Sequence, residues 1–96
     1  MVFCFNTPFI TSSMFFVYIL LSEKTGKYYI GSTGDVDDRL YRHNSGQSKY
    51  TKSGLPWALV YREEYSTRGE AMKRENEIKR WKSHKRISVL INSSSD

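Results

Sequence analysis

Two short β-rich runs joined by a glycine-containing loop constrain the fold of this chain more than any other feature. Residues 15–21 are apolar or aromatic throughout, and residues 27–32 read Lys-Tyr-Tyr-Ile-Gly-Ser. Strand-forming runs separated by a few residues with a glycine such as Gly26 are typical of a β-hairpin. If Tyr18 lies opposite Tyr29, a loop of four residues remains, which is a common hairpin length. That register predicts that both tyrosines point from the same face of the sheet.

The pattern that follows the hairpin predicts a helix, a third strand and two further helices. Residues 35–44 begin with acidic side chains, which suit the first turn of a helix, and Ser45-Gly46 is a typical stop. Residues 58–65 form a third β-rich run. Residues 67–70, Thr-Arg-Gly-Glu, form a capping box that begins a second helix, and a last short helix ends at residue 91. We therefore predict the order strand, strand, helix, strand, helix, helix.

The composition indicates a small basic domain. The 96 residues carry a net charge of +5, and the sequence pI is about 9.4. A chain of this length forms one domain. Nucleic-acid backbones are the commonest large anionic partners, because each neutralised phosphate releases a counterion. Mild basicity that serves solubility explains the charge equally well, so charge alone leaves both interpretations open.

The cysteine and histidine content limits the metal and the compartment. A single cysteine, Cys4, excludes an internal disulfide and fits a reducing cytosol, so we expect a cytoplasmic protein. One cysteine and two histidines are too few ligands for a structural zinc site. Any bound metal is therefore expected to be a hard, oxygen-ligated ion such as Mg²⁺ or Mn²⁺.

The two ends of the chain differ from its centre. Residues 1–13 lack the basic start of a signal peptide, and Pro8 and Thr11-Ser12-Ser13 interrupt their pattern. We expect an extra N-terminal arm there, disordered or preceding the biological start, then a domain at residues 14–91 and a frayed tail at residues 92–96. No run approaches the roughly 18 apolar residues that a transmembrane helix needs, so no membrane partner is expected.

Glu75 is the most informative single position of the predicted second helix. At 100° per residue, Ala71, Glu75 and Ile78 lie within about 60° of one another, so the carboxylate falls on the apolar face. A carboxylate there loses hydration unless it is paired or bound to a metal. A buried salt bridge to an arginine, or a helix rotated so that Glu75 lies in water, would explain the same position.

Arg39 and His43 form an i,i+4 pair at the edge of the apolar stripe of the first helix. A guanidinium can clamp a phosphate with two hydrogen bonds, and a neighbouring imidazole can relay protons. A solvated helix edge is the alternative for such a pair. Tyr18 and Tyr29, taken alone, are ordinary strand aromatics, because a phenol with a reference pKa near 10 acts as a base only when strongly perturbed.

Five lysines are candidates for contacts to a phosphate backbone. The alternative is an ordinary solvated helix face, whose charge is partly balanced by neighbouring glutamates. If they act together, they are predicted to bind nucleic acid through its phosphates. They lie in the loop before the third strand and in or after the second helix: Lys49, Lys52, Lys79, Lys82 and Lys85.

The combination of these motifs resembles the GIY-YIG nuclease superfamily. Members begin with a Gly-Ile-Tyr-like strand, continue with a Tyr-Ile-Gly strand, and add a helical arginine and a glutamate on a later helix. Here ten residues separate Tyr18 from Tyr29, and Arg39 and Glu75 follow in the corresponding places. The small stand-alone bacterial members, of the URI type and the uncharacterised UPF0213-like family, are the most similar. The resemblance covers residues 14–91. It is carried by Val17-Tyr18-Ile19-Leu20, Tyr29-Ile30-Gly31-Ser32-Thr33, His43-Asn44-Ser45-Gly46, Tyr50-Thr51, Leu59-Val60-Tyr61, and Glu70-Ala71 leading to Ile78-Lys79.

The resemblance implies an α+β fold, an α/β sandwich in which a small three-stranded antiparallel sheet is flanked by helices. It also implies a divalent-metal-dependent endonuclease that hydrolyses phosphodiester bonds in DNA, in repair or in the processing of branched or single-stranded structures. One ion, Mg²⁺ or Mn²⁺, is the implied cofactor. Neither a small-molecule cofactor nor an oligomer is expected, so the protein should be a monomer.

The resemblance assigns roles to five side chains by position. Glu75 would bind the metal, and Arg39 would stabilise the transition state electrostatically. His43 would relay a proton. Either Tyr18 or Tyr29 would orient or deprotonate the attacking water, and the choice between them stays open.

The chain retains one of the two motif glycines. Gly31 would let backbone or substrate approach the sheet closely, whereas the first motif reads Phe16-Val17-Tyr18 and has no glycine. The asparagine that many members place after the metal-binding helix also lacks a counterpart, because neither Asn76 nor Asn92 fits. That loss favours the alternative of a non-catalytic nucleic-acid-binding or protein-docking module with the same fold. A small-molecule enzyme is disfavoured, because no glycine-rich phosphate loop is present.

Overall fold

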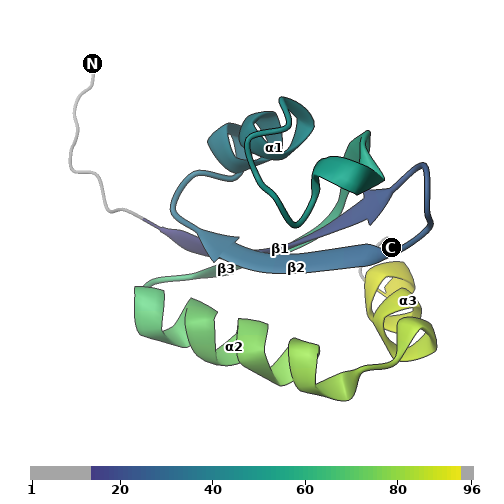
Figure 1. Cartoon of the computed structure of the whole chain (residues 1–96). Coiled ribbons are helices and arrows are strands. Elements are labelled where there is room, and N and C mark those ends of the chain that lie inside the picture. The colour runs from purple at the N-terminus through teal and green to yellow at the C-terminus, as the bar shows by residue number, and fades with distance from the viewer. Residues whose placement is uncertain (1–13, 94–96) are drawn as a thin grey trace, which may run out of the picture.

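The predicted α+β architecture is confirmed by the computed structural model, which describes residues 14–93. Three strands form one antiparallel sheet in the order β2-β1-β3 (Figure 1). Apart from a short 3₁₀ turn, the order of the elements is the predicted one. The elements are β1 (Phe15–Ser22), β2 (Tyr28–Thr33), α1 (Val36–Asn44), the turn η1 (Lys52–Gly54), β3 (Trp57–Tyr65), α2 (Arg68–Trp81) and α3 (His84–Ser93).

Helices cover both faces of the sheet, so the central strand β1 is buried on both sides. Figure 1 shows α1 on one face and α2 and α3 on the other. This arrangement explains why residues 15–21 show no alternation of apolar and polar side chains. The core toward α1 contains Tyr18, Leu20, Val36 and Trp57. The core toward α2 and α3 contains Val17, Ile19, Ile30, Ala71, Ile78 and Ile87.

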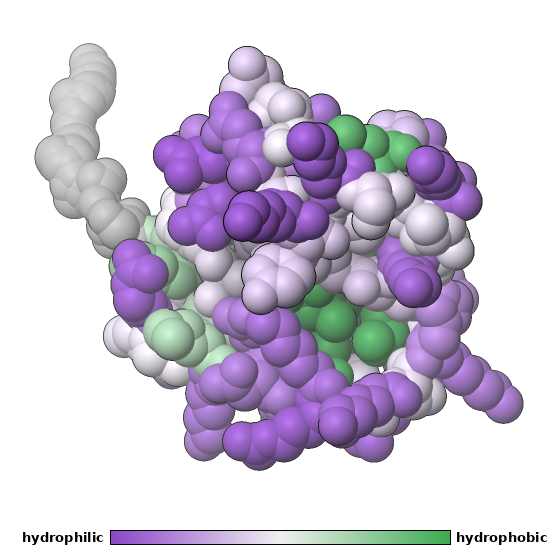
Figure 2. All heavy atoms as spheres, in the orientation of Figure 1, coloured by the Kyte–Doolittle hydropathy of each residue, from purple (hydrophilic) through white to green (hydrophobic). Residues whose placement is uncertain are grey.

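Hydrophilic side chains cover most of the face of the molecule that Figure 2 shows. Figure 2 shows them over the helices, with a hydrophobic patch left in a hollow below the middle of the sheet. Three isoleucines of the α2-side core, Ile30, Ile78 and Ile87, line a hollow on this side of the sheet. Apolar surface exposed in a hollow and framed by charged groups is typical of a ligand-binding position.

The hairpin register differs from the prediction by two residues. Tyr18 pairs with Gly31, and Tyr29 pairs with Leu20. The predicted register was wrong because it required Gly26 in an extended strand position, whereas a φ of +76° places Gly26 in the loop. Since side chains alternate with a period of two, a shift of two residues leaves each side chain on its face. The prediction that Tyr18 and Tyr29 share a face is therefore confirmed, and their ring centroids lie 6.3 Å apart.

The helix boundaries follow the predicted capping signals. Asp35 is the N-cap of α1 rather than its first residue, and its Oδ1 accepts a hydrogen bond from the Asp38 N–H at 3.0 Å. Thr67 caps α2 in the same way, because its hydroxyl oxygen accepts from the Glu70 N–H at 3.2 Å. Lys82 ends α2 in a left-handed conformation with a φ of +47°, which turns the chain sharply into α3.

The C-terminal helix extends further than the sequence predicts. α3 ends at Ser93, so residues 92 and 93 of the expected tail are helical. The rest of that tail, residues 94–96, and the expected N-terminal arm, residues 1–13, lie outside the described residues. Among the helices of residues 14–93, none is long and apolar enough to cross a membrane.

Candidate active site

A hydrogen-bonded chain of three buried side chains lies between the sheet and α1. Tyr18 Oη lies 3.2 Å from His43 Nε2, and His43 Nδ1 lies 2.8 Å from Thr51 Oγ1. Tyr18 is 1% exposed, and His43 is 5% exposed. Because both ring nitrogens have partners, the imidazole is held in one orientation. The imidazole proton can then lie on Nε2, toward Tyr18, or on Nδ1, toward Thr51, depending on the tautomer.

Tyr18 reaches the edge of the sheet by lying across Gly31. The two residues are register partners, with Tyr18 on the central strand β1 and Gly31 on the edge strand β2. A Cβ at Gly31 would lie 2.5 Å from Tyr18 Oη and 2.7 Å from its Cζ. The phenol of Tyr18 therefore makes a close approach at Gly31, where the sequence predicts one.

A polar cleft of about 320 Å³ opens beside this chain. The Tyr29 ring lies at its wall, with its centroid 4.8 Å from that of His43. Arg39 is exposed on α1 at the same cleft, so its guanidinium is accessible to a bound anion. Three predicted site residues thus share one cleft, and Tyr18 is hydrogen-bonded to one of them. The full lining is Tyr29, Arg39, Arg42, His43, Gln47 and Ser48.

Glu75 approaches the edge strand from the α2 side of the sheet. Its Oε1 accepts a hydrogen bond from Ser32 Oγ at 2.6 Å, and its Oε2 accepts from Lys79 Nζ at 2.6 Å. The side chain is only 16% exposed, and Ala71 and Ile78 beside it on the helix are buried. The predicted apolar face is confirmed. The ionic partner of Glu75 is Lys79, one turn later on the same helix. Both alternatives, a salt bridge to an arginine and a glutamate that lies in water, are therefore wrong.

Charged groups on both sides of the sheet contribute to the pKa of Tyr18. Burial raises the pKa of Tyr18 to about 12, and Tyr29 and the Glu75 carboxylate add to the rise. The Arg39 guanidinium acts in the opposite direction. One hydroxyl therefore responds to Arg39 on α1 and to Glu75 on α2. Glu75 does not line the cleft that Tyr29, Arg39 and His43 share, and it lies on the α2 side of the sheet.

Glu75 supplies the carboxylate that can hold a metal ion at this edge. Within residues 14–93, no cluster of three or more His, Cys, Asp or Glu side chains surrounds a metal position. Mg²⁺ is usually held by one or two carboxylates and completed by water and substrate phosphates, so a lone carboxylate is sufficient for it. The Lys79 ammonium already lies against Oε2, which shows that the carboxylate attracts a cation. A carboxylate is the kind of oxygen donor that a hard divalent ion takes, so Glu75 could bind one.

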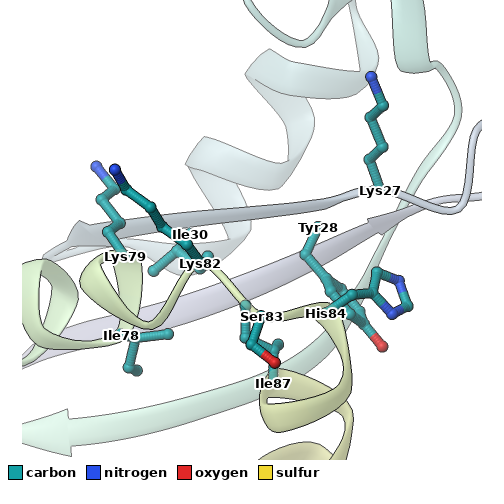
Figure 3. Close-up of a pocket in the computed structure, with 9 residues that line it drawn as sticks. All are labelled: Lys27, Tyr28, Ile30, Ile78, Lys79, Lys82, Ser83, His84 and Ile87. Atoms are coloured by element: carbon teal, nitrogen blue, oxygen red, sulfur yellow. The ribbon is translucent and has the colours of Figure 1, made fainter.

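The five predicted lysines do not form one surface. Lys79 and Lys82 lie side by side at the end of α2 (Figure 3), and Lys85 follows on α3. Lys49 and Lys52 lie between α1 and β3, on the opposite side of the sheet from α2 and α3 (Figure 1). A nucleic acid that contacts both groups must cross an edge of the sheet.

Two residues of the site received no role from the sequence. Ser32 lies two positions after Ile30, so strand alternation would have placed it on the α2 face beside the predicted position of Glu75. Thr51 lies in an irregular loop. No periodicity relates a loop residue to a helix, so no local signal identifies Thr51 as the partner of His43.

Acidification is expected to destabilise the fold through His43. Burial, together with the charge of Arg39, lowers the pKa of His43 below its usual value of 6.5. The unfolded chain therefore binds a proton near pH 6.5 and the folded chain does not. The free energy of unfolding should be highest above that pH and should decline as the pH falls below it. Urea unfolding of the wild type and of His43→Gln from about pH 8 to about pH 5 measures this dependence. An identical slope in both proteins would assign the effect to other groups.

Comparison with known proteins gives matches along most of the chain. The family model of the GIY-YIG catalytic domain matches residues 14–88. A UPF0213 protein of Staphylococcus saprophyticus is 41% identical over 76 residues, which are 78% of this chain and 92% of the relative. A UPF0213 protein of Staphylococcus aureus strain Mu3 is 45% identical over 76 residues with the same coverage. The solution NMR structure of a UPF0213 protein of Bacillus halodurans has a TM-score of 0.54 and 36% identity, covering 84% of this chain and 85% of that one.

Proposed function

The chain belongs to the GIY-YIG catalytic domain family, and from this membership we propose that it is a divalent-metal-dependent endonuclease hydrolysing phosphodiester bonds in DNA. One observation carries the proposal. Tyr29, Arg39 and His43 line one cleft, and Tyr18 is hydrogen-bonded to His43 beside it. A guanidinium, two phenols and an imidazole at one cleft suit a reaction in which negative charge grows on a phosphate. Repair or processing of structured DNA is the role we propose for it.

Glu75 is the residue that would hold the divalent ion. When bound, the ion supplies electrostatic stabilisation for the transferring phosphate and for the leaving oxygen. Ser32 acts as a positioning residue, because its hydroxyl holds Oε1 at 2.6 Å and so fixes the direction of the carboxylate. Lys79 has a long, flexible stem, so its ammonium can leave Oε2 for a phosphate oxygen.

Arg39 is placed to stabilise charge on the phosphate. The N-cap at Asp35 and the buried Val36 fix the start of α1, one turn before Arg39. The guanidinium is exposed and lines the polar cleft. Two parallel hydrogen bonds to phosphate oxygens are the contact that its planar fork favours.

Burial distinguishes the two tyrosines. Tyr18 is almost fully buried and its pKa is raised to about 12, which opposes loss of its proton. It serves best as a fixed hydroxyl whose hydrogen bond holds the neutral His43 imidazole in place. Tyr29 is half-buried and lines the cleft itself. These observations support Tyr29 as the residue that contacts the attacking water.

Replacing Tyr29 with phenylalanine is expected to lower the single-turnover cleavage rate by about a hundred-fold. The ring stays in its place against His43, so the free energy of unfolding should change by less than about 1 kcal/mol. Tyr41→Phe is the matched control, because Tyr41 lies on α1 and is 68% exposed. Equal rates for the wild type and Tyr29→Phe would remove Tyr29 from the chemistry.

A non-catalytic nucleic-acid-binding module is the second candidate. It is favoured because the asparagine that many family members place after the metal-binding helix has no counterpart in this chain. Asn76 is exposed on α2. Asn44 is engaged by the backbone of Trp57, because its Oδ1 accepts from Trp57 N–H at 2.7 Å and its Nδ2 donates to Trp57 O at 3.0 Å. Neither of these two amides supports Glu75.

Cleavage of labelled duplex, single-stranded and branched DNA in Mg²⁺, in Mn²⁺ and in EDTA tests the proposed function. We expect cutting with either ion and none in EDTA, because the chain offers a single carboxylate and the phosphate charge needs a counter-cation. If no substrate is cut in any ion while binding persists with a steep salt dependence, the module replaces the nuclease.

A further inference from the structure

A second hollow lies on the α2 side of the sheet, between β2, the end of α2 and the start of α3 (Figure 3). Its volume is about 320 Å³, within the range that suits small ligands. The buried side chains of Ile30, Ile78 and Ile87 form its floor. The hydrophobic patch in Figure 2 is in the same region of the surface. The floor offers dispersion contacts and no hydrogen bonds, which suits the face of a planar ring.

Three lysines surround this apolar floor. Lys79 and Lys82 extend side by side at one end, and Lys27 extends from the other end (Figure 3). In residues 14–93, neither Lys27 nor Lys82 makes a salt bridge. A purely apolar ligand would leave these cations unused, and a bare phosphate would leave the floor unused. A ligand with both a flat ring and an anionic group, such as a nucleotide, matches both parts.

The hollow is continuous with the proposed metal-binding carboxylate. Lys79 lines the hollow and its Nζ also donates to Glu75 Oε2 at 2.6 Å. Ile30 in the floor and Ser32 at Glu75 are two residues apart on β2, so they share one face of the strand, about 7 Å apart along it. A strand whose phosphate lies at Glu75 can therefore place a neighbouring nucleotide in the hollow.

Contacts within the protein hold the hollow open before any ligand binds. The rings of Tyr28 and His84 are stacked with centroids 4.4 Å apart, and His84 Nε2 donates to Gly26 O at 3.0 Å. Tyr28 Oη lies 2.8 Å from Ser88 Oγ on α3. These contacts fasten α3 to the hairpin. A site formed in advance requires little ordering of the protein when a ligand enters.

We propose that this hollow binds one unpaired nucleotide of the DNA strand, with its base on the isoleucine floor and its phosphate at the lysines. The inference rests on the proposed function, because it identifies the occupant as a neighbour of the phosphodiester at Glu75. A base that is paired and stacked in a duplex cannot enter such a hollow without being extruded. The substrate class is therefore DNA with a single-stranded or flapped segment beside the cleaved bond.

Methyl NMR of the full chain in EDTA tests occupancy of the hollow without cleavage. The probes are a 5′-phosphorylated thymidine dinucleotide, a single-stranded oligonucleotide, a blunt duplex and inorganic phosphate. We expect saturable shifts of the δ1-methyl signals of Ile30, Ile78 and Ile87 with the dinucleotide and the single strand. Equal shifts with the duplex or with phosphate alone would overturn the proposal.

Two double variants, each of which removes two positive charges, distinguish binding in the hollow from non-specific attraction of DNA to the basic surface. Lys27→Ala/Lys82→Gly removes two rim cations, and glycine suits the left-handed backbone at position 82. Lys73→Ala/Arg80→Ala removes two cations from the opposite stripe of α2. Only the first should weaken single-strand saturation of the isoleucine shifts, by about ten-fold. The plot of log K against log salt should also become less steep, by about 0.7 for each phosphate that the removed lysines had neutralised. Equal losses in both variants would overturn the proposal.

The failure of this inference can be told apart from failure of the proposed function. If DNA is cut with a divalent ion but the isoleucine methyls do not respond, the nuclease assignment stands and the nucleotide subsite is wrong. If the methyls respond as expected but no DNA is cut, the subsite stands and the catalytic assignment is wrong. In an active protein with a functioning subsite, the preference for flapped over blunt DNA should fall in Lys27→Ala/Lys82→Gly. An unchanged preference would count against the subsite.

Discussion

Glu75→Gln is expected to lower the metal-dependent cleavage rate by at least about a thousand-fold. Glutamine keeps the length of the side chain, and its carbonyl oxygen can still accept from Ser32 or Lys79. What disappears is the negative charge, which the divalent ion needs in a site with one carboxylate. The fold should be retained, because Ala71 and Ile78 continue to bury the same helix face. Single-turnover rates in Mn²⁺, with Mn²⁺ binding followed by electron paramagnetic resonance, give two readouts.

Glu77→Gln is the matched control for that variant. Glu77 lies two residues along α2, its side chain is 55% exposed, and it pairs with Arg74. It loses the same charge from the same helix, so its cleavage rate and its Mn²⁺ binding should stay close to those of the wild type. Full activity in Glu75→Gln would mean that the cleavage comes from a contaminant or that the metal is held elsewhere.

Gly31→Ala should both destabilise the protein and disable it. The added Cβ would lie 2.5 Å from Tyr18 Oη and 2.7 Å from Cζ, so the phenol must move. Tyr18 is buried and hydrogen-bonded to His43, so the movement disturbs a packed core. We expect a loss of about 2 kcal/mol in the free energy of unfolding. Displacing Tyr18 and His43 by about 1 Å should lower the cleavage rate by about a hundred-fold. Urea unfolding and single-turnover cleavage measure the two effects.

Gly34→Ala is the control for the glycine substitution. A Cβ at Gly34 would lie 3.7 Å from the Phe15 ring, which is an ordinary contact. It should therefore leave both stability and cleavage nearly unchanged. In a Tyr18→Leu background the cost of Gly31→Ala should shrink, because the atoms that clash are gone. Equal costs in both backgrounds would show that the Tyr18 ring is not the group that requires a glycine.

The features predicted correctly from the sequence are the local ones. The helical repeat places Glu75 between Ala71 and Ile78, and capping signals mark the starts of α1 and α2. Each of these depends on residues within a few positions of one another. Strand alternation likewise puts Tyr18 and Tyr29 on one face, even though the register was wrong by two residues.

The features that escaped prediction join residues far apart in the chain. The hairpin register depended on the φ of Gly26, which the residue type permits and does not dictate. Thr51 meets His43 because an irregular loop folds back on α1. Ser32 meets Glu75 because α2 crosses β2 at that point. Periodicity predicts which face of its own strand or helix a side chain occupies. It does not predict how far that side chain lies from a residue in another element.

The paired tyrosine motifs show where this division lies. Hydrophobic pattern and loop chemistry are local, so the hairpin and the common face of Tyr18 and Tyr29 can be predicted from the residues alone. The folded arrangement was needed to show that the Tyr18 ring lies across Gly31 and that its hydroxyl reaches His43. It also decided that a hollow remains beside Glu75. Both outcomes follow from how helices pack against the two faces of the sheet, and packing is set by the combined shapes of side chains that are distant in sequence.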